Sequence, residues 1–155
     1  MIRKILIANR GEIAVRIVRA CQEADIESVA IYADADRHAL HVKKATEAYN
    51  IGPDPVTGYL NAHRIVNLAA ATGCDALHPG YGFLSENAQF VQIVEDHEIT
   101  FIGPSAEHIR IMGDKITAKD TMKKLGVPCV PGSDGGVPDM ETARKVAEDI
   151  GFPVI

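Results

Sequence analysis

The sequence predicts an α/β fold built on a doubly wound parallel sheet, followed by the beginning of a second domain. Short apolar runs alternate with amphipathic helical stretches through the first 103 residues, which is the rhythm of β–α–β units with right-handed crossovers. Loop-forming residues follow several of the apolar runs, as they do where strands pass into helices. After Gly103 this alternation ends, so we expect two domains, residues 1–103 and residues 104–155.

The first domain is expected to hold five strands with helices between them. Apolar runs bounded by polar or turn residues predict strands at 5–8, 27–33, 48–51, 75–77 and 99–102. Helical spacing predicts helices over 13–21, 37–44, 60–71 and 87–97. Asn9 with Glu12 has the spacing of a capping box, and capping residues precede or begin the other three helices: Asp36, Asn61 and Ser85.

Residues 104–155 predict three helices and two short strands. Ser105 and Asp114 are expected to cap helices that reach residues 111 and 125, and Asp139 to cap a third that stops at Gly151. Strands are expected at 127–130 and from residue 152 onward. A domain does not normally stop at the first strand of a new sheet, so we expect this chain to be an amino-terminal part of a longer protein.

The composition is that of a soluble globular protein, with 46% hydrophobic and 24% charged residues. A formal charge of −5 with dispersed basic residues argues against a nucleic-acid partner. No run approaches the ~18 apolar residues of a membrane span, and the amino terminus leads directly into a strand, so we expect a cytoplasmic protein. Three widely spaced cysteines indicate neither a disulfide framework nor a zinc site, and Cys21 is expected in the core.

The segment 78–87 is the strongest candidate for a binding site. It combines an imidazole, a phenol and flexible glycines at the exit of a predicted strand: His78, Tyr81, Gly80 and Gly82. Ligands of open α/β sheets bind at such strand-to-helix turns. A tight connection whose glycines serve only the turn explains the same residues equally well, so the spacing alone leaves both interpretations open.

Other polar residues have both a functional and a structural interpretation. Asp34 and Asp36 lie about 20 residues after the first turn, where a dinucleotide-binding fold carries its ribose-binding acid, but that turn has one glycine where the motif needs three. Helix capping is the better explanation for both aspartates. His38 and His41, three residues apart, have no third ligand and are expected as surface histidines rather than a metal site.

Lys115 is unusual because it places a cation in the first turn of a helix, where the helix dipole disfavours positive charge. A nearby anion would remove the conflict, whereas a solvated lysine neutralised by Asp114 is the plainer interpretation. Arg16, Arg19 and Glu23 fall at helical spacing and form either an exposed charged face or a contact with a partner.

Five segments in one order resemble the biotin carboxylase component of biotin-dependent carboxylases, an ATP-grasp family. The resemblance covers essentially the whole chain, and the motifs are specific in combination although none is specific alone. The segments are Ile7-Ala8-Asn9-Arg10-Gly11-Glu12-Ile13-Ala14, the run from His78 to Asn87, Phe101-Ile102-Gly103-Pro104, Ile111-Met112-Gly113-Asp114-Lys115, and Gly126-Val127-Pro128-Cys129-Val130-Pro131-Gly132.

The resemblance implies a Rossmann-like pre-ATP-grasp domain followed by the start of an ATP-grasp domain. It implies an enzyme in which ATP and bicarbonate give carboxyphosphate and the carboxyl group passes to N1 of biotin on a carrier protein. The implied cofactors are ATP with Mg²⁺, and biotin is the carrier-bound substrate. The implied partners are the biotin carboxyl carrier protein, the carboxyltransferase component and a second copy in a homodimer.

The resemblance also assigns roles to single residues. Lys115 matches the lysine that contacts the ATP phosphates, and Tyr81 and Gly82 match positions that line the biotin pocket, with His78 shaping the adjoining turn. Arg19 and Glu23 match residues of the homodimer interface. The glycine-rich segment 131–136 matches a connection without a catalytic role.

The resemblance implies that the second ATP-binding lysine, the phosphate lid and the ligands of magnesium and bicarbonate would follow residue 155. No catalytic residue is therefore expected within residues 1–155, and this chain alone is expected to be inactive and to bind free biotin weakly or not at all. Two other classes compete with this interpretation: a nucleotide-binding regulatory or dehydrogenase domain, and a non-catalytic dimerisation module. The final carboxyl acceptor, whether acetyl-CoA, propionyl-CoA, pyruvate or another acid, is not encoded here.

Overall fold

The structure is a computed structural model that describes residues 1–133 and 135–154. The chain divides into two compact units, Met1–Ile109 and Arg110–Ile155, and each is considered by itself.

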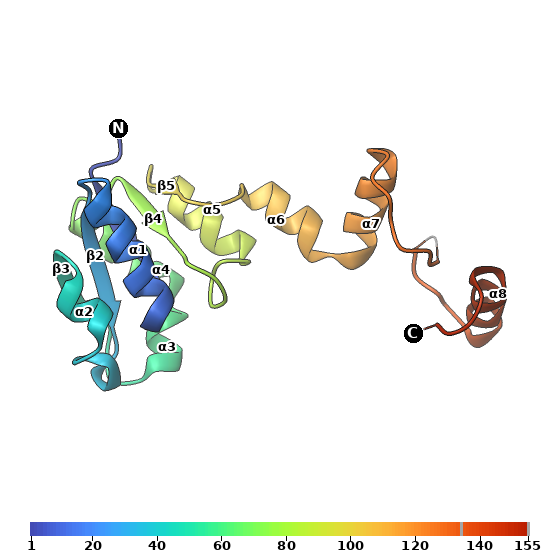
Figure 1. Cartoon of the computed structure of the whole chain (residues 1–155), viewed down its shortest axis with the longest axis horizontal. Coiled ribbons are helices and arrows are strands. Elements are labelled where there is room, and N and C mark those ends of the chain that lie inside the picture. Colours follow the sequence, from blue (N-terminus) through green and yellow to red (C-terminus); the bar gives the residue numbers. More distant parts are fainter. Residues whose placement is uncertain (134, 155) are drawn as a thin grey trace. The chain divides into compact units, whose positions relative to one another are not determined.

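The first unit is built on a five-stranded, fully parallel sheet, as the sequence predicts (Figure 1). The strands are β1 (Lys4–Ile7), β2 (Glu27–Tyr32), β3 (Glu47–Asn50), β4 (Ala76–His78) and β5 (Thr100–Phe101). Their order is β3-β2-β1-β4-β5, so the chain leaves the central strand β1 toward one edge and later returns to build the other. The carboxyl ends of β1 and β4 are neighbours at this reversal, which is the topological switch point where α/β folds bind ligands.

Helices lie on both faces of the sheet. They are α1 (Gly11–Glu23), the short 3₁₀ helix η1 (Asp34–Asp36), α2 (Leu40–Lys44), α3 (Pro55–Tyr59), α4 (Ala62–Ala71) and α5 (Ala88–Asp96). Alternate residues of β1 serve different cores, because successive strand side chains point to opposite faces. Leu6 belongs to the larger core with residues of α3, α4 and α5, whereas Ile5 and Ile7 pack with α1. Cys21 is buried in the second core, as predicted.

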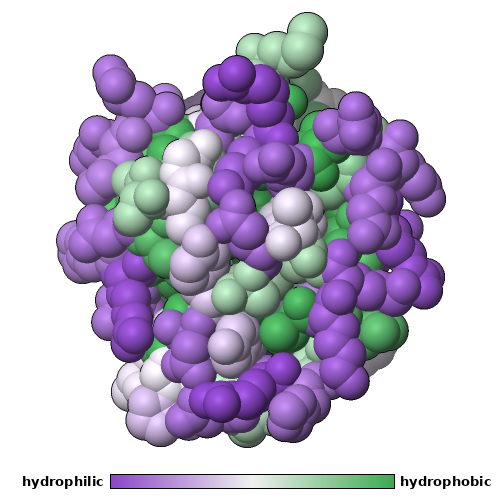
Figure 2. Space-filling model, turned by 90° about the vertical axis from the view of Figure 1, so that its left-hand side faces the viewer, coloured by the Kyte–Doolittle hydropathy of each residue, from purple (hydrophilic) through white to green (hydrophobic). Residues whose placement is uncertain are grey.

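The edge of the sheet that β3 forms is polar. Lys4 donates to Glu47 at 2.5 Å, and the hydroxyl of Tyr49 donates to the same carboxylate at 2.6 Å. Figure 2 shows the side of the first unit at which β3 lies in Figure 1, and hydrophilic residues cover most of the visible surface with small hydrophobic patches between them. Charged side chains at a sheet edge disfavour pairing with a strand of another molecule.

Three of the predicted helix caps of the first unit are wrong. The side chain of Asn9 contacts the loop after β4 instead of closing a capping box on α1, whose N-cap is Arg10. Asp36 binds Arg10 and Tyr59, while α2 begins after Ala39. The side chain that caps α5 is Asn87, which accepts from the amide of Phe90 at 2.9 Å, rather than Ser85. The predicted cap at Asn61 is confirmed.

His41 is also placed differently from the prediction. It was expected at the surface with His38, and it is fully buried, with Nε2 3.3 Å from the carbonyl oxygen of Ile31. Helix α2 has only five residues, which is too short for a periodic pattern to indicate which side faces the core.

The second unit is helical in its described part. Helix α6 (Ala106–Gly113) spans the boundary between the units, and α7 (Lys115–Lys124) and α8 (Met140–Ile150) follow. Asp114 and Asp139 cap α7 and α8 as predicted, and Gly151 follows α8 with φ 91°. The strands predicted at 127–130 and 152–154 are wrong: these residues are irregular, and they have no partner strand within the described chain. Residue 155 lies outside the described residues.

Candidate functional site

The turn after β1 and the loop after β4 meet at the switch point through the side chain of Asn9. Its Nδ2 donates to the carbonyl oxygens of Pro79 at 2.7 Å and Tyr81 at 2.9 Å. Its Oδ1 accepts from the amide of Arg10 at 2.9 Å. Asn9 is 3% exposed, so these contacts are shielded from water, and a buried side chain whose bonds are all satisfied fixes its neighbours strongly.

Two glycines of the loop have different reasons to be glycine. Gly80 has φ 68°, and a Cβ there would lie 2.7 Å from Nδ2 of Asn9, so no side chain fits against this amide. Gly82 has φ 65°, yet no described atom lies within 4 Å of a Cβ built on it. The first glycine permits close approach within the protein, and the second leaves open space beside Tyr81.

His78 is a neutral imidazole in a defined tautomer. The amide of Gly80 donates to its Nδ1 at 3.0 Å, so Nδ1 is the acceptor and the proton lies on Nε2. Burial lowers the pKa of His78 below its ordinary value. At neutral pH the residue therefore offers a hydrogen-bond donor without a charge.

Tyr81 is 62% exposed, and its hydroxyl donates to Oε1 of Glu12 on α1. This hydrogen bond raises the pKa of Tyr81, because the carboxylate favours the protonated phenol. Tyr81 is thus a neutral phenol whose orientation is fixed by its bond to Glu12.

A second set of contacts reaches the same loop from the turn after β1, from η1 and from α3. Arg10 donates to both oxygens of Asp36, from Nε at 2.7 Å and from Nη2 at 2.5 Å. Tyr59 donates to Asp36 at 2.9 Å, and its ring stacks on Phe83 with centroids 5.5 Å apart and planes at 7°. The bonds from Arg10 hold the pKa of Asp36 below its ordinary value, whereas burial raises the pKa of Tyr59.

The position of Asp36 counts against a dinucleotide site. Asp36 is 8% exposed, and its carboxylate is already bonded to Arg10 and Tyr59, so it is not available for a ribose hydroxyl. The capping role predicted for it is wrong as well, since both bonds are to side chains remote in sequence. Asp34 is bonded to Asn50 at 2.6 Å.

The outer face of α1 carries the residues expected at a dimer interface. Arg19 and Glu23 are exposed and border a groove of about 750 Å³ with other residues of α1 and Leu40 of α2. Glu12 borders the same groove and also binds Tyr81. The groove and the loop after β4 therefore share one carboxylate.

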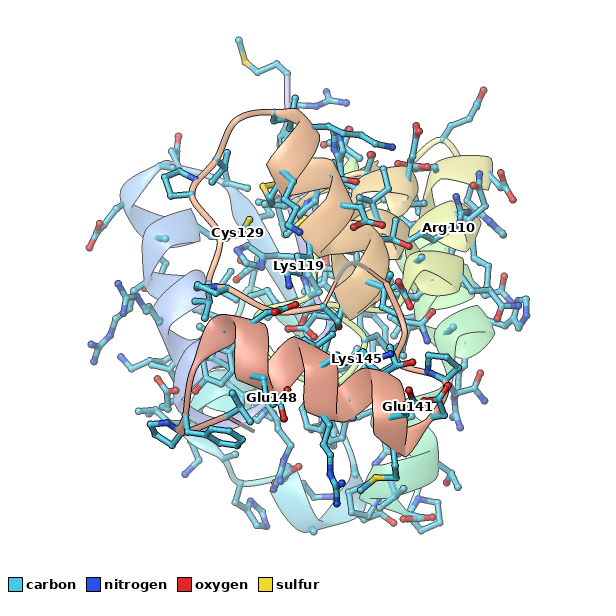
Figure 3. All side chains as sticks on the ribbon, turned by 90° about the vertical axis from the view of Figure 1, so that its right-hand side faces the viewer. Arg110, Lys119, Cys129, Glu141, Lys145 and Glu148 are labelled. Carbon is cyan, nitrogen blue, oxygen red and sulfur yellow. The ribbon has the colours of Figure 1, made fainter. Side chains whose placement is uncertain are left out.

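Lys115 belongs to the second unit. It is the first residue of α7, it is exposed, and Asp114 caps the helix by accepting from the amide of Thr117 at 2.7 Å. One turn further on, Nζ of Lys119 donates to the carbonyl oxygen of Ser133 at 3.0 Å. On α8, Nζ of Lys145 lies 3.1 Å from Oε1 of Glu141. Figure 3 shows both residues together with Lys119.

The structure thus brings His78, Tyr81 and Gly82 together in one loop and places Arg19 and Glu23 on one helix face. Sequence reasoning missed the residues that hold this loop: Asn9, Arg10, Glu12, Asp36, Tyr59 and Phe83. A signal was present, because Asn9 and Arg10 directly follow the first strand and so lie at the ligand-binding edge of a parallel sheet.

The parallel sheet, with Asn9 joining two loops at its switch point, is typical of α/β domains that bind ligands at this edge of the sheet. Residues 1–109 match the N-terminal domain of biotin carboxylase, and residues 114–155 match the ATP-binding domain of the carbamoyl-phosphate synthase L chain. The chain therefore belongs to the biotin carboxylase family, and it comprises the N-terminal domain and the start of the ATP-grasp domain.

Characterised relatives match the whole chain but extend well beyond it. Biotin carboxylase 1 of Bacillus subtilis is 56% identical over 156 residues, and the match covers 100% of this chain and 35% of the relative. The 2-oxoglutarate carboxylase small subunit of Hydrogenobacter thermophilus is 54% identical over 155 residues, covering 100% and 33%. The chain thus spans about a third of the length of these relatives.

A solved structure is similar to this chain in both fold and sequence. The biotin carboxylase domain dimer of 2-oxoglutarate carboxylase from H. thermophilus, in complex with MgADP, ADP and bicarbonate, superposes with a TM-score of 0.92 at 54% identity. The match covers 99% of this chain and 34% of that one.

Two features are absent from the described residues. No helix there is long and apolar enough to cross a membrane. No group of three or more His, Cys, Asp and Glu side chains in the described part of the chain is arranged to hold a metal ion.

Proposed function

We propose that this chain is the amino-terminal part of an ATP-dependent biotin carboxylase, in which the loop after β4 forms one wall of the biotin pocket. The observation that supports it best is the junction at the switch point, where Asn9 fixes the loop that carries Tyr81. The family gives the reaction class, and the junction gives a rigid place for a neutral, hydrogen-bonding substrate.

The chemistry of the loop suits the ureido ring of biotin, which has a carbonyl acceptor and N–H donors but no charge. The Nε2–H of His78 and the hydroxyl of Tyr81 are neutral polar groups at neutral pH, and their lowered and raised pKa values keep them so. The open space at Gly82 allows a flat ring to approach the backbone. These groups orient the substrate; they carry no part of the bond-breaking step.

Lys115 is proposed to contact the ATP phosphates. Its cation lies in the first turn of α7, where a bound anion would offset both the lysine charge and the helix dipole. Bound Mg²⁺ would neutralise phosphate charge in such a reaction. The described residues contain no cluster of acids to hold that ion, so its ligands would come from the remainder of the enzyme.

The proposed partners are the biotin carboxyl carrier protein, the carboxyltransferase component and a second copy that meets Arg19 and Glu23 on α1. The relatives named above differ in what their names say they carboxylate, yet they match at 54% and 56% identity. Identity in this region therefore does not separate the acceptors, and the proposal leaves the acceptor open.

A chimeric enzyme tests the proposal. Residues 1–155 replace the matching segment of B. subtilis biotin carboxylase 1, and bicarbonate-dependent ATP hydrolysis and carboxylation of free biotin are measured. We expect activity from the chimera and none from residues 1–155 alone. An inactive chimera that folds and binds ATP would contradict the proposal, and so would bicarbonate-dependent hydrolysis by residues 1–155.

A variant of the chimera tests the assignment of the loop. Tyr81→Ala is expected to raise the KM for biotin more than the KM for ATP, because the phenol faces the proposed biotin site and Lys115 lies in the other unit. Equal changes in both constants would contradict the role of Tyr81.

A further inference from the structure

Phe83 has an unfavourable backbone conformation in the middle of the candidate loop. Its φ is 47°, in the left-handed region that bulky side chains rarely adopt. Such a conformation persists only where neighbouring contacts hold it. The ring of Phe83 stacks in parallel on the ring of Tyr59, and this contact supports the conformation.

Tyr59 is a rigid support for that ring. It is 1% exposed, and its hydroxyl donates to Asp36 at 2.9 Å and lies 3.4 Å from the carbonyl oxygen of Ile31. The guanidinium of Arg10 lies 5.8 Å from the centre of the Tyr59 ring and closes the set by binding both oxygens of Asp36. A buried carboxylate bonded to a cation and a phenol fixes the position of both.

The two supports of the loop converge on adjacent residues of the turn after β1. Asn9 holds the carbonyl oxygens of Pro79 and Tyr81, and Arg10 holds Phe83 through Asp36 and Tyr59. Gly82 lies between the two supports, and a Cβ there would have no described neighbour. The backbone bond from the amide of Ser85 to the carbonyl oxygen of Gly82 and the supports on either side hold its conformation.

We propose that Arg10, Asp36 and Tyr59 are positioning residues that hold the loop 80–85 in its biotin-binding shape through the ring of Phe83. The link to biotin rests on the proposed function. That these residues hold the loop in its shape does not depend on it. In this proposal the three residues act on the loop through Phe83, which stacks on Tyr59.

The first measurement is amide hydrogen exchange in the 155-residue chain. The amide of Ser85 donates to Gly82 within the loop at 2.9 Å, and the amide of Ala8 donates to His78 across the sheet at 2.9 Å. Tyr59→Phe keeps the aromatic ring and removes the bond to Asp36. We expect the Ser85 amide to exchange about tenfold faster, because a bond to a charged group is lost, while the Ala8 amide changes little.

The matched control is Tyr49→Phe, which removes a bond from a tyrosine hydroxyl to Glu47 at the sheet edge, remote in sequence from the loop. A second variant, Phe83→Leu, removes the stack without altering Asp36, and it should loosen the Ser85 amide in the same way. Equal acceleration of the Ser85 and Ala8 amides, or an effect of Tyr59→Phe no larger than that of Tyr49→Phe, would overturn the proposal.

The second measurement uses the chimeric enzyme. If the loop keeps its shape for about a third of the time in Tyr59→Phe, the KM for biotin rises about threefold, while the KM for ATP stays unchanged. An unchanged KM for biotin in an active chimera would overturn the proposal. If the unmutated chimera is inactive, the proposed function fails, and hydrogen exchange alone decides whether these residues position the loop.

Discussion

The side-chain amide of Asn9 donates to the main-chain carbonyl of Tyr81 at 2.9 Å, although 72 residues separate them. The same nitrogen reaches Pro79, so one buried side chain joins the turn after β1 to the loop after β4. The sheet order makes this possible, because β1 and β4 are neighbours and end at the same edge. Loss of this one side chain would therefore leave both carbonyl oxygens without their donor.

Asn9→Ala should lower the free energy of unfolding of the first unit by about 2 kcal/mol, since it leaves two carbonyls without their donor. Urea unfolding followed by tyrosine fluorescence measures it, because the chain has no tryptophan and its four tyrosines all lie before residue 110. The control is Asn50→Ala, which removes two exposed bonds, one to Asp34 and one from the amide of Gly52, and should change the energy by no more than about 0.5 kcal/mol. Equal effects of the two variants would show that the junction is unimportant.

Gly80→Ala should destabilise the first unit more than Gly82→Ala. Both residues have positive φ, so each alanine costs about 1 kcal/mol of backbone strain. Only at Gly80 would the new Cβ also overlap Asn9, which should add about 2 kcal/mol. The difference between the two variants in the same unfolding experiment isolates the steric part, and a difference near zero would contradict the close packing.

What the sequence predicted well is what local pattern determines. Apolar runs and helical spacing identified all five strands of the first unit, and local spacing identified the caps at Asn61, Asp114 and Asp139. The loop that follows His78 could be predicted because its glycines directly follow a strand in the sequence, which is a local pattern.

Prediction failed where a side chain bonds far along the chain. Asp36 has the spacing of a helix cap, yet its partner Arg10 is 26 residues away, and a bidentate bond to a guanidinium outweighs a cap. The strand predicted at 127–130 failed for a related reason, because a strand needs a partner to accept its backbone hydrogen bonds and none lies beside it in the described chain.

The stability of the first unit should fall as the pH drops below about 6.5. Burial lowers the pKa values of His41 and His78, so the unfolded chain takes up protons near pH 6.5 that the folded chain does not. Their contribution is complete above that pH and is lost as the pH falls toward the folded pKa values. The stability that Asp36 contributes is present above its ordinary pKa of 3.8 and is lost only below that pH, which separates the two windows.

The share of His41 can be measured by substitution. Its Nδ1 has no hydrogen-bond partner among the described atoms; Asp36 favours its protonation, while burial and Arg10 oppose it. His41→Leu should therefore reduce the slope of unfolding energy against pH, by at most about 1.4 kcal/mol per pH unit. His38→Gln, at an exposed position, should leave the slope as it is. A slope that survives His41→Leu unchanged would contradict the prediction.

Glu12→Gln should lower the pKa of Tyr81, because the carboxylate that favours the protonated phenol is replaced by a neutral amide. Tyr49 gives a matched control, since its pKa is raised by the equivalent bond to Glu47. In a nuclear magnetic resonance titration with labelled tyrosine, Glu12→Gln should move only Tyr81 and Glu47→Gln only Tyr49. A shift of both residues in either variant would mean that the effect is a general change of charge.

The proposed dimer makes a prediction about charge on α1. A two-fold interface brings the same patch of both copies together, so reversing the charge of Arg19 alters the contact twice. In the chimeric enzyme, Arg19→Glu should weaken dimerisation by at least about tenfold, measured by sedimentation velocity, because unpaired like charges then meet in the contact. Arg64→Glu, on α4, should not change it. If Arg19 pairs with Glu23 across the axis, combining Arg19→Glu with Glu23→Arg restores the dimer, whereas repulsion that persists in the double variant would show that the two residues meet other groups.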